Sequence, residues 1–426
     1  MAPGSLRRAL AWGSVVAIVL LIVFAMVYNK ELTRVYHVIR LFEPEDILHN
    51  FRSMETMFDT APVRRGPVAH QFERNVGNLP STYVYKGHTK RISDFLEQTW
   101  TTGMVVLQDG AIVYENYYRG NAASSKVISW SVAKSFVSAL MGIAVEEGHI
   151  RDIHQPVTDY VPALRGSGYD GVSIKNVLQM SSGIRFNEDY GDFWSDINRL
   201  GRAIAFNASL DDFVASLRRE RPPGTFHQYV SMDTQVLGMV LRAATGETLA
   251  SYLESRIWRK IGMESDAYWL IDRNGMELAF GGLNAVLRDY ARLGQLYLNE
   301  GRWAGEQVVP RAWVRASVTP DAPHLQPGNP NSSWVLGYGY QWWIPQQPDG
   351  DYLAIGVYNQ FIYVDPKRNI VIAKSSAYPA YNVDGQDREL ETIAAFRAIA
   401  RQLATPPHGR DVSISDRLTS TADETR

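Results

Sequence analysis

Cysteine is absent from the 426 residues of the chain. Its absence excludes disulfide bonds, thiolate catalysis and cysteine-ligated metal sites. The chain also lacks a surplus of either charge, because 43 Lys and Arg side chains are balanced by 45 Asp and Glu side chains. A general nucleic-acid-binding protein carries a basic surplus, so we expect no nucleic-acid partner. The length suits one large domain or two interleaved domains.

Several well-known catalytic motifs are missing as well. The chain contains no Gly-x-Ser-x-Gly motif, which disfavours the nucleophile elbow of an α/β-hydrolase. It contains no His-Glu-x-x-His motif, and its nine histidines are scattered along the chain, so we expect no metal site. It contains no P-loop, and its Gly-x-Gly-x-x-Gly match at residues 166–171 lies outside the predicted strands, whereas the dinucleotide-binding motif directly follows a strand. We therefore expect an activity that needs neither a metal nor another cofactor.

The N-terminal region contains a long uncharged stretch. The 20 residues at positions 9–28 include no charged side chain, and a helix of that length spans about 30 Å, the thickness of the hydrocarbon core. Arg7 and Arg8 precede it and favour a cytoplasmic N-terminus. A cleaved signal peptide is the alternative, since residues 23–25 could form a cleavage site. The stretch exceeds the usual apolar region of a signal peptide, so we expect a membrane anchor.

Strand patterns occur at both ends of the remaining chain, with helical patterns between them. Residues 104–114 form two β-rich runs joined at Asp109-Gly110 and predict a hairpin. A second hairpin is predicted over residues 361–373. Helices are predicted by apolar periodicity over residues 131–147, 236–244, 249–261 and 388–403. This order predicts one sheet closed by the two ends of the domain, with a helical insertion.

The segment from Ser129 to Ser135 carries the most informative chemistry. Ser131 and Lys134 are three residues apart, so on a helix their side chains share a face. A serine hydroxyl becomes a strong nucleophile when a base takes its proton, and a desolvated lysine can be that base. The same spacing is also common at ordinary helix starts that carry an exposed lysine.

Other segments of the chain strengthen the catalytic interpretation of Ser131 and Lys134. Tyr229 lies on a loop just before a predicted helix. Seven segments carry a family resemblance: residues 109–120, 129–135, 177–184, 223–229, 281–298, 337–343 and 358–366. In these segments the chain resembles the serine β-lactamase and penicillin-binding protein superfamily, and within it the class C-related esterases and 6-aminohexanoate-dimer hydrolases.

The resemblance implies a role for each matching residue. Ser131 would be the acylated nucleophile, Lys134 its proton partner, and Tyr229 the residue that passes a proton to the leaving group. An adjacent ammonium would lower the pKa of the Tyr229 phenol, and the sequence leaves open which of the two is the resting base. The oxyanion hole would combine the Ser131 N–H with an N–H near Val357 and Tyr358.

Two departures from the family pattern concern the substrate. The tyrosine motif reads Tyr229-Val230-Ser231, which makes Ser231 a candidate polar contact, and residues 356–360 lack the cation found in the third β-lactamase motif. Without that cation we expect weak β-lactamase and D,D-carboxypeptidase activities. Trp194 and Asn284 are further candidates for substrate contact, although a lid or core aromatic and a helix N-cap explain them equally well.

The resemblance implies an α/β (α+β) β-lactamase/transpeptidase-like fold: a largely antiparallel sheet flanked by helices, with an all-helical region. The uncharged stretch at residues 9–28 predicts one transmembrane helix before this domain. We expect a serine hydrolase that faces the outer side of the inner or plasma membrane and cleaves a small ester or amide. The alternatives are a cell-wall D-amino-acid peptidase and a catalytically idle penicillin-binding-like module. The sequence permits a homo-oligomer. The expected divisions are residues 1–8 (cytoplasmic), 9–28 (membrane anchor), 29–75 (stalk or wrap), 76–405 (hydrolase domain) and 406–426 (disordered tail).

Overall fold

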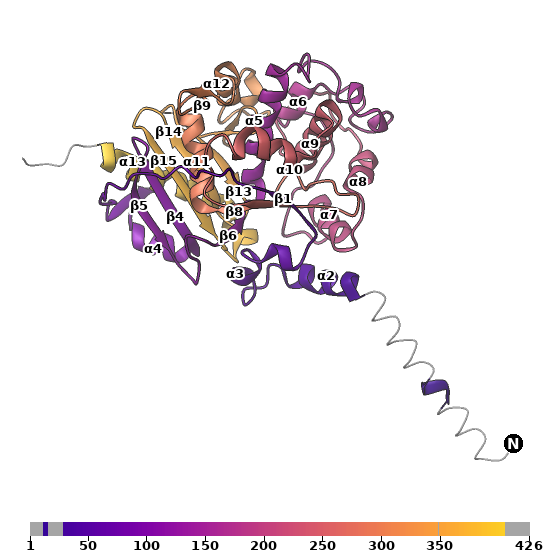
Figure 1. Ribbon diagram of the computed structural model, residues 1–426, viewed down its shortest axis with the longest axis horizontal. Coiled ribbons are helices and arrows are strands. Elements are labelled where there is room, and N and C mark those ends of the chain that lie inside the picture. Colours follow the sequence, from indigo (N-terminus) through magenta and orange to yellow (C-terminus); the bar gives the residue numbers. More distant parts are fainter. Residues whose placement is uncertain (1–11, 16–28, 348, 405–426) are drawn as a thin grey trace, which may run out of the picture.

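A seven-stranded antiparallel sheet forms the centre of the molecule (Figure 1). The structure is a computed structural model that describes residues 12–15, 29–347 and 349–404. The strand order is β11-β12-β13-β14-β15-β4-β5. These strands are β4 (Thr101–Gln108), β5 (Ala111–Tyr117), β11 (Gly337–Tyr338), β12 (Trp343–Ile344), β13 (Tyr352–Gly356), β14 (Gln360–Asp365) and β15 (Ile370–Ser376).

Both predicted hairpins are confirmed. Strands β4 and β5 meet at Asp109-Gly110, where both residues have positive φ, the conformation that an Asp-Gly hairpin turn requires. Strands β14 and β15 form the second hairpin. Strand β15 also pairs with β4, so segments from the two ends of the domain close one sheet, as the sequence predicted.

The other strands of the described residues form three smaller sheets. A four-stranded sheet has the order β1-β7-β8-β6, and two further sheets have two strands each. Their strands are β1 (Thr60–Val63), β6 (Lys126–Ile128), β7 (Ala267–Leu270), β8 (Leu283–Val286), the pair β2 (Thr82–Tyr85) and β3 (His88–Arg91), and the pair β9 (Arg302–Trp303) and β10 (Glu306–Gln307). Strand β1 thus ties the segment before residue 75 to the body of the domain.

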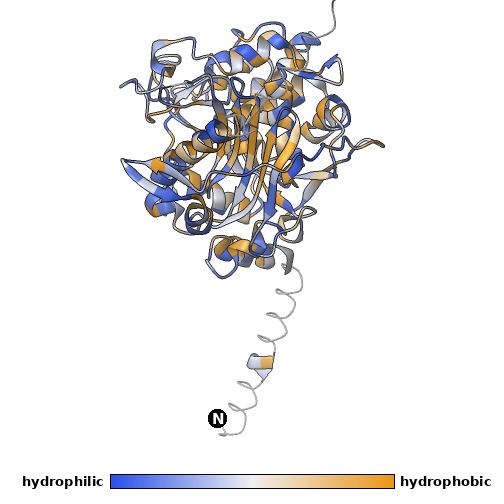
Figure 2. Cartoon of the chain, turned by 90° about the vertical axis from the view of Figure 1, so that its left-hand side faces the viewer, coloured by the Kyte–Doolittle hydropathy of each residue, from blue (hydrophilic) through white to orange (hydrophobic). Residues whose placement is uncertain are grey.

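Helices cover both faces of the large sheet. Helix α11 (Leu287–Leu298) approaches one face so closely that a Cβ at Gly294 would lie 2.5 Å from the Val371 side chain. On the other face, Phe396 of α13 (Tyr381–Ala404) packs against Phe361 and α4 (Ile92–Gln98) joins the same apolar cluster. The apolar strands consequently lie inside polar helices and loops (Figure 2).

A further group of helices forms the region that contains the predicted insertion. They are α5 (Ala133–Glu146), α6 (Ile174–Leu178), α7 (Asp196–Ala205), α8 (Leu210–Ser216), α9 (Ser231–Thr245), α10 (Leu249–Leu253) and α12 (Arg311–Ser317). A π-helical turn (Glu254–Trp258) follows α10, so the helix predicted over residues 249–261 is in fact irregular after one turn. Short 3-10 turns occupy Met54–Thr56, Trp130–Val132, Val157–Asp159, Pro162–Leu164 and Pro323–Leu325.

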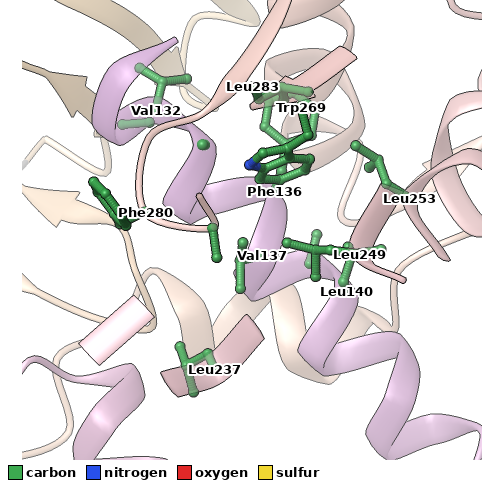
Figure 3. Packing of buried hydrophobic residues seen from close by; sticks show 14 of the residues in the cluster. Val132, Phe136, Val137, Leu140, Leu237, Leu249, Leu253, Trp269, Phe280 and Leu283 are labelled. Carbon is green, nitrogen blue, oxygen red and sulfur yellow. The ribbon is translucent and has the colours of Figure 1, made fainter. Parts of the chain in front are cut away.

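Helix α5 is the buried axis of the helical region. Phe136, Val137 and Leu140 on this helix are inaccessible to solvent and pack in one cluster with Leu237 of α9 and Trp269 of β7 (Figure 3). Fully burying one such side chain contributes about 1.5–3 kcal/mol. The start of α5, where Ser131 lies, is therefore held by a packed core.

The N-terminal part of the described chain packs onto the domain. It contains α2 (Asn29–Arg40) and α3 (Ile47–Asn50), and Arg34 forms a 2.7 Å ion pair with Asp59 just before β1. Among residues 12–15, 29–347 and 349–404, no helix is both long and apolar enough to cross a bilayer. The expected membrane anchor at residues 9–28 lies outside the described residues apart from residues 12–15, as does the expected disordered tail.

Replacing two helical glycines with alanine should change the free energy of unfolding in opposite directions. In Gly142→Ala of α5 the new Cβ would lie 2.3 Å from the Trp313 ring, so we expect a loss of about 1–3 kcal/mol from overpacking. In Gly201→Ala of α7 the Cβ meets no atom within 4 Å, and we expect a gain of about 0.4–1 kcal/mol. Thermal unfolding of the full chain measures both; equal shifts of the midpoint would contradict the packing described.

Candidate active site

Ser131 lies in the 3-10 turn that leads into α5. Trp130, directly before it, has a φ of +44°, a left-handed conformation that is uncommon for a bulky residue and typical of strained functional turns. The Lys134 Nζ lies 2.8 Å from the Ser131 Oγ. The i, i+3 geometry predicted from the sequence is therefore present.

The Lys134 amine is enclosed by polar atoms and shielded from water. Only 1% of the residue is exposed, and its Nζ lies 2.7 Å from the Phe280 carbonyl oxygen and 3.3 Å from the Ser231 Oγ. Burial lowers the pKa of Lys134 to about 7, against the opposing charge of Glu188. A substantial fraction of this amine is consequently neutral near pH 7 and can accept a proton.

Tyr229 lies beside the same two residues. Its hydroxyl is in hydrogen-bonding reach of Ser131, its ring lies 5.0 Å from the Lys134 Nζ, and it stacks on Trp343 at 5.2 Å. Burial, together with the charge of Glu188, raises the pKa of Tyr229 well above its usual value. The expectation of a lowered phenol pKa was therefore wrong: desolvation is the largest cause of the shift, and the hydrogen bond with Ser131 opposes it only in part.

Glu188 is a half-buried carboxylate of this site that was not predicted from the sequence. It accepts hydrogen bonds from the Ser231 N–H at 3.0 Å, from the Ser231 hydroxyl, and from the Tyr190 hydroxyl at 3.0 Å. Burial raises the pKa of Glu188, while the nearby Lys134 charge opposes that shift. Glu188 lies in a loop without periodicity, so no local pattern could have pointed to it. Ser231, predicted as a polar contact, connects Glu188 to Lys134.

The turn between β13 and β14 forms the other side of the site. Gly356 lies so close that a Cβ there would be 2.6 Å from the Ser129 carbonyl oxygen and 3.2 Å from the Ser131 nitrogen. Tyr358 and Asn359 follow with φ of +61° and +76°. This close approach places the predicted oxyanion segment around Val357 and Tyr358 next to the Ser131 N–H.

A lysine lies behind this turn, although the turn itself has no cation. The Lys374 Nζ of β15 lies 3.2 Å from the Asn359 Oδ1, which also accepts a 2.9 Å hydrogen bond from Thr392. Burial lowers the pKa of Lys374 well below its usual value. Lys374 is not among the residues that line the cleft in front of Ser131, so it supports the turn without presenting a charge to that cleft.

The other candidate residues, Trp194 and Asn284, have partners other than Ser131, Lys134 and Tyr229. Trp194 is 81% exposed and packs edge-on against Phe193. Asn284 is buried in β8, where its Nδ2 donates to the Gly282 carbonyl oxygen at 3.0 Å. His227 bonds Ser332 through Nδ1 at 2.8 Å, and burial lowers its pKa to about 3. Neither Trp194 nor Asn284 lines the cleft.

A cleft of about 1060 Å³ opens in front of Ser131 and Tyr229. Its described lining includes the carboxylates of Glu188, Asp189, Asp384, Asp387 and Glu389, and Arg221 is the only cation among those lining residues. Within the described part of the chain, no group of three or more His, Asp or Glu side chains is arranged to hold a metal ion. Ser131 and Tyr229 line the cleft, and Lys134 is buried next to Ser131; these three residues are a set suited to acyl transfer.

Comparison with known proteins agrees with this geometry. The sequence profile of the family described as Beta-lactamase matches residues 89–395. The chain belongs to the Beta-lactamase family. It is 33% identical over 293 residues to the "6-aminohexanoate-dimer hydrolase" of Paenarthrobacter ureafaciens, a match that covers 67% of this chain and 74% of the relative.

Solved structures of the family share the architecture. The structure named "Putative 6-aminohexanoate-dimer hydrolase from Bacillus anthracis" superposes with a TM-score of 0.75 at 25% identity, covering 84% of this chain and 95% of the other. A "family VIII carboxylesterase" superposes with a TM-score of 0.55 at 16% identity, covering 71% of this chain and 92% of the other. This Beta-lactamase-family chain has the β-lactamase/transpeptidase-like fold and is a serine hydrolase.

The lowered pKa of Lys134 predicts the pH dependence of hydrolysis. If the neutral amine is the base, kcat/KM rises with pH and levels off above about pH 7, the pKa of Lys134. Glu188→Gln removes a negative charge that favours the ammonium form of Lys134, so it should lower the pKa of Lys134. The acid limb, the part of the profile in which kcat/KM rises with pH, should then move to lower pH by about one unit.

The pH profile of ester hydrolysis measures the position of this limb. Asp189→Asn serves as the control, because Asp189 is the exposed neighbour of Glu188 and its loss should leave the limb in place. A profile without an acid limb between pH 5 and 9, or a Glu188→Gln limb at the wild-type pH, would contradict the assignment.

Proposed function

We propose that this hydrolase cleaves an ester or amide bond of a small substrate through an acyl-enzyme on Ser131. The observation that carries the proposal is the 2.8 Å separation between the Ser131 Oγ and a buried Lys134 amine whose pKa is lowered to about 7. An exposed lysine with an ordinary pKa would be charged and could not take the serine proton.

Each proton in the reaction has a residue that can move it. Neutral Lys134 takes the Ser131 proton as Oγ attacks the carbonyl carbon, and the resulting oxyanion accepts hydrogen bonds from the Ser131 N–H and from the turn near Val357. Tyr229, which keeps its phenol proton, donates it to the departing oxygen or nitrogen as the bond to the carbonyl carbon breaks. The proton on Lys134 restores Tyr229. Water then attacks the acyl-enzyme, and the same groups return the proton to Ser131.

The charge of the cleft supports a substrate other than a β-lactam. A β-lactam or a peptide ending in D-Ala carries a carboxylate, and the exposed carboxylate of Asp189 lines the cleft. Arg221 is already engaged with Gln228 at 2.9 Å and with Glu220 at 3.2 Å. We therefore rank a cell-wall D-amino-acid peptidase below a hydrolase of neutral or cationic esters and amides.

A catalytically idle binding module is the alternative from another class. A module that only binds would need neither a desolvated lysine nor a strained turn before the serine, because both raise the free energy of the folded state. Their presence favours an active enzyme.

We propose further that residues 9–28 anchor the enzyme in the inner or plasma membrane with the hydrolase domain on the outer side. The uncharged stretch and the preceding arginines support this, as do the exposed side chains of Leu32, Tyr36 and Ile39 on one side of α2, which begins at Asn29. Sedimentation of the full chain with membranes, compared with a chain beginning at residue 29, tests the anchor. Equal sedimentation of the two would contradict it.

The role of Tyr229 predicts a dependence on the leaving group. Tyr229→Phe should lower kcat/KM for alkyl esters by about 10²–10⁴-fold, and should affect p-nitrophenyl esters far less, since p-nitrophenolate leaves without a proton. Tyr338→Phe is the matched control, because Tyr338 is a buried tyrosine 6.3 Å from the Tyr229 ring. Equal losses on both ester types would remove Tyr229 from the proton path, and activity retained by Ser131→Ala would refute the acyl-enzyme.

The cleft charge predicts poor turnover of carboxylated substrates. Wild-type protein should hydrolyse penicillin and a D-Ala-D-Ala peptide at least about 100-fold more slowly, in kcat/KM, than neutral esters, a difference of roughly 2.7 kcal/mol in transition-state free energy. Spectrophotometric assays of both classes measure this ratio. Efficient turnover of either carboxylated compound would favour the peptidase or β-lactamase alternative.

A further inference from the structure

A second cavity, distinct from the cleft, also reaches Ser131. Its volume is about 110 Å³, and its walls come from segments far apart in the sequence. Val38, Leu41 and Phe42 line it from the end of α2 and the residues that follow, and Ile197, Leu200 and Ile204 line it from α7.

The chemistry of this cavity contrasts with that of the cleft. None of its described lining residues carries a charge, and apart from tyrosine and tryptophan rings the polar side chains are those of Ser131, Asn198 and Ser231. Cavities of roughly 150 Å³ lined by Leu, Ile and Phe stay dry and bind benzene, so this smaller cavity suits an apolar group of about four or five carbons. A charged or strongly hydrated group would lose its hydration there without a compensating partner.

Ser131 lies where the two cavities meet. Ser131, Tyr190 and Val357 line both cavities, whereas Tyr229 lines the cleft alone. The departing alcohol or amine needs the Tyr229 proton and so must leave on the cleft side. The other substituent of the carbonyl carbon, the acyl chain, then extends toward the apolar cavity.

One wall of the apolar cavity comes from outside the region that matches the family. That match begins at residue 89, whereas Phe42 precedes it and stacks on Tyr358 at 4.9 Å with its ring 5.7 Å from Trp130. Phe42 therefore contacts both turns that shape the site. The N-terminal segment adds an apolar surface beside the nucleophile that residues 89–395 alone do not supply.

We infer that this cavity, the acyl pocket, binds the apolar acyl chain of the substrate, and that the substrate is an ester or amide of a medium-chain carboxylic acid. The inference rests on the proposed acyl-enzyme at Ser131 and adds its substrate class. Each methylene buried in the pocket contributes about 0.8 kcal/mol, or about fourfold in kcat/KM.

A pair of isomeric esters tests whether the pocket binds an apolar chain and whether that chain lies on the acyl side of the ester bond. Methyl hexanoate and pentyl acetate have the same composition, but the long chain is on the acyl side in the first and on the alcohol side in the second. We expect the full-length wild-type protein to prefer methyl hexanoate by about tenfold or more in kcat/KM, measured by titration of the released acid; this corresponds to burying two or more methylenes.

Gly201 provides a variant that fills the pocket. Gly201 lines the cavity, and a Cβ there meets no atom within 4 Å, so Gly201→Leu should project into the open space and Gly201→Ala should do so to a smaller extent. Ala203→Leu adds the same bulk two residues along α7, about 200° around the helix, at a position that does not line the pocket. Thermal unfolding confirms that each variant is folded.

The outcomes separate this inference from the proposed function. A preference for methyl hexanoate that falls stepwise in Gly201→Ala and Gly201→Leu, and persists in Ala203→Leu, is the expected result. Equal rates on the two esters, a preference for pentyl acetate, or a preference that Gly201→Leu leaves intact would overturn the acyl pocket while the hydrolase stands. Hydrolysis of neither ester would overturn the proposed esterase activity, and this inference with it.

Discussion

Burial of the Lys134 amine beside the Ser131 hydroxyl is the constraint on which the rest of the site depends. A lysine that is 1% exposed needs polar partners, since an unpaired buried charge or amine is costly. The Phe280 carbonyl and the hydroxyls of Ser131 and Ser231 supply these partners. Segments separated by as many as 146 residues must therefore converge before the amine acquires a pKa near 7.

Bringing these segments together around Lys134 leaves two backbone turns in strained conformations. Trp130 and Tyr358 both have positive φ, a conformation that costs roughly 1–3 kcal/mol per residue. The two strained turns are packed against each other through Gly356 and covered by Phe42, and the start of α5 continues into a solvent-inaccessible core around Phe136. The strain is tolerated because the surrounding packing determines the position of both turns.

The features that the sequence predicted correctly are those that depend on interactions between residues close together in the chain. The hairpin at Asp109-Gly110 follows from turn chemistry, and the approach of Lys134 to Ser131 follows from helical spacing; the structure contains both. Glu188 and the packing of Phe42 depend on contacts between distant segments, and no short-range pattern marks either. The direction of the Tyr229 pKa shift was missed for a related reason: proximity to a charge can be inferred from sequence, but desolvation, which dominates here, depends on the whole fold.

The activation of Ser131 by neutral Lys134 can be measured as the rate at which a fluorophosphonate labels Ser131, followed by intact mass across pH. We expect one adduct, absent in Ser131→Ala, whose rate of formation rises with pH up to about 7, where the lowered pKa of Lys134 lies. Lys134→Met keeps an apolar stem of similar size and should slow labelling by about 100-fold or more. Labelling at the wild-type rate in Lys134→Met, or an adduct that persists in Ser131→Ala, would contradict the account.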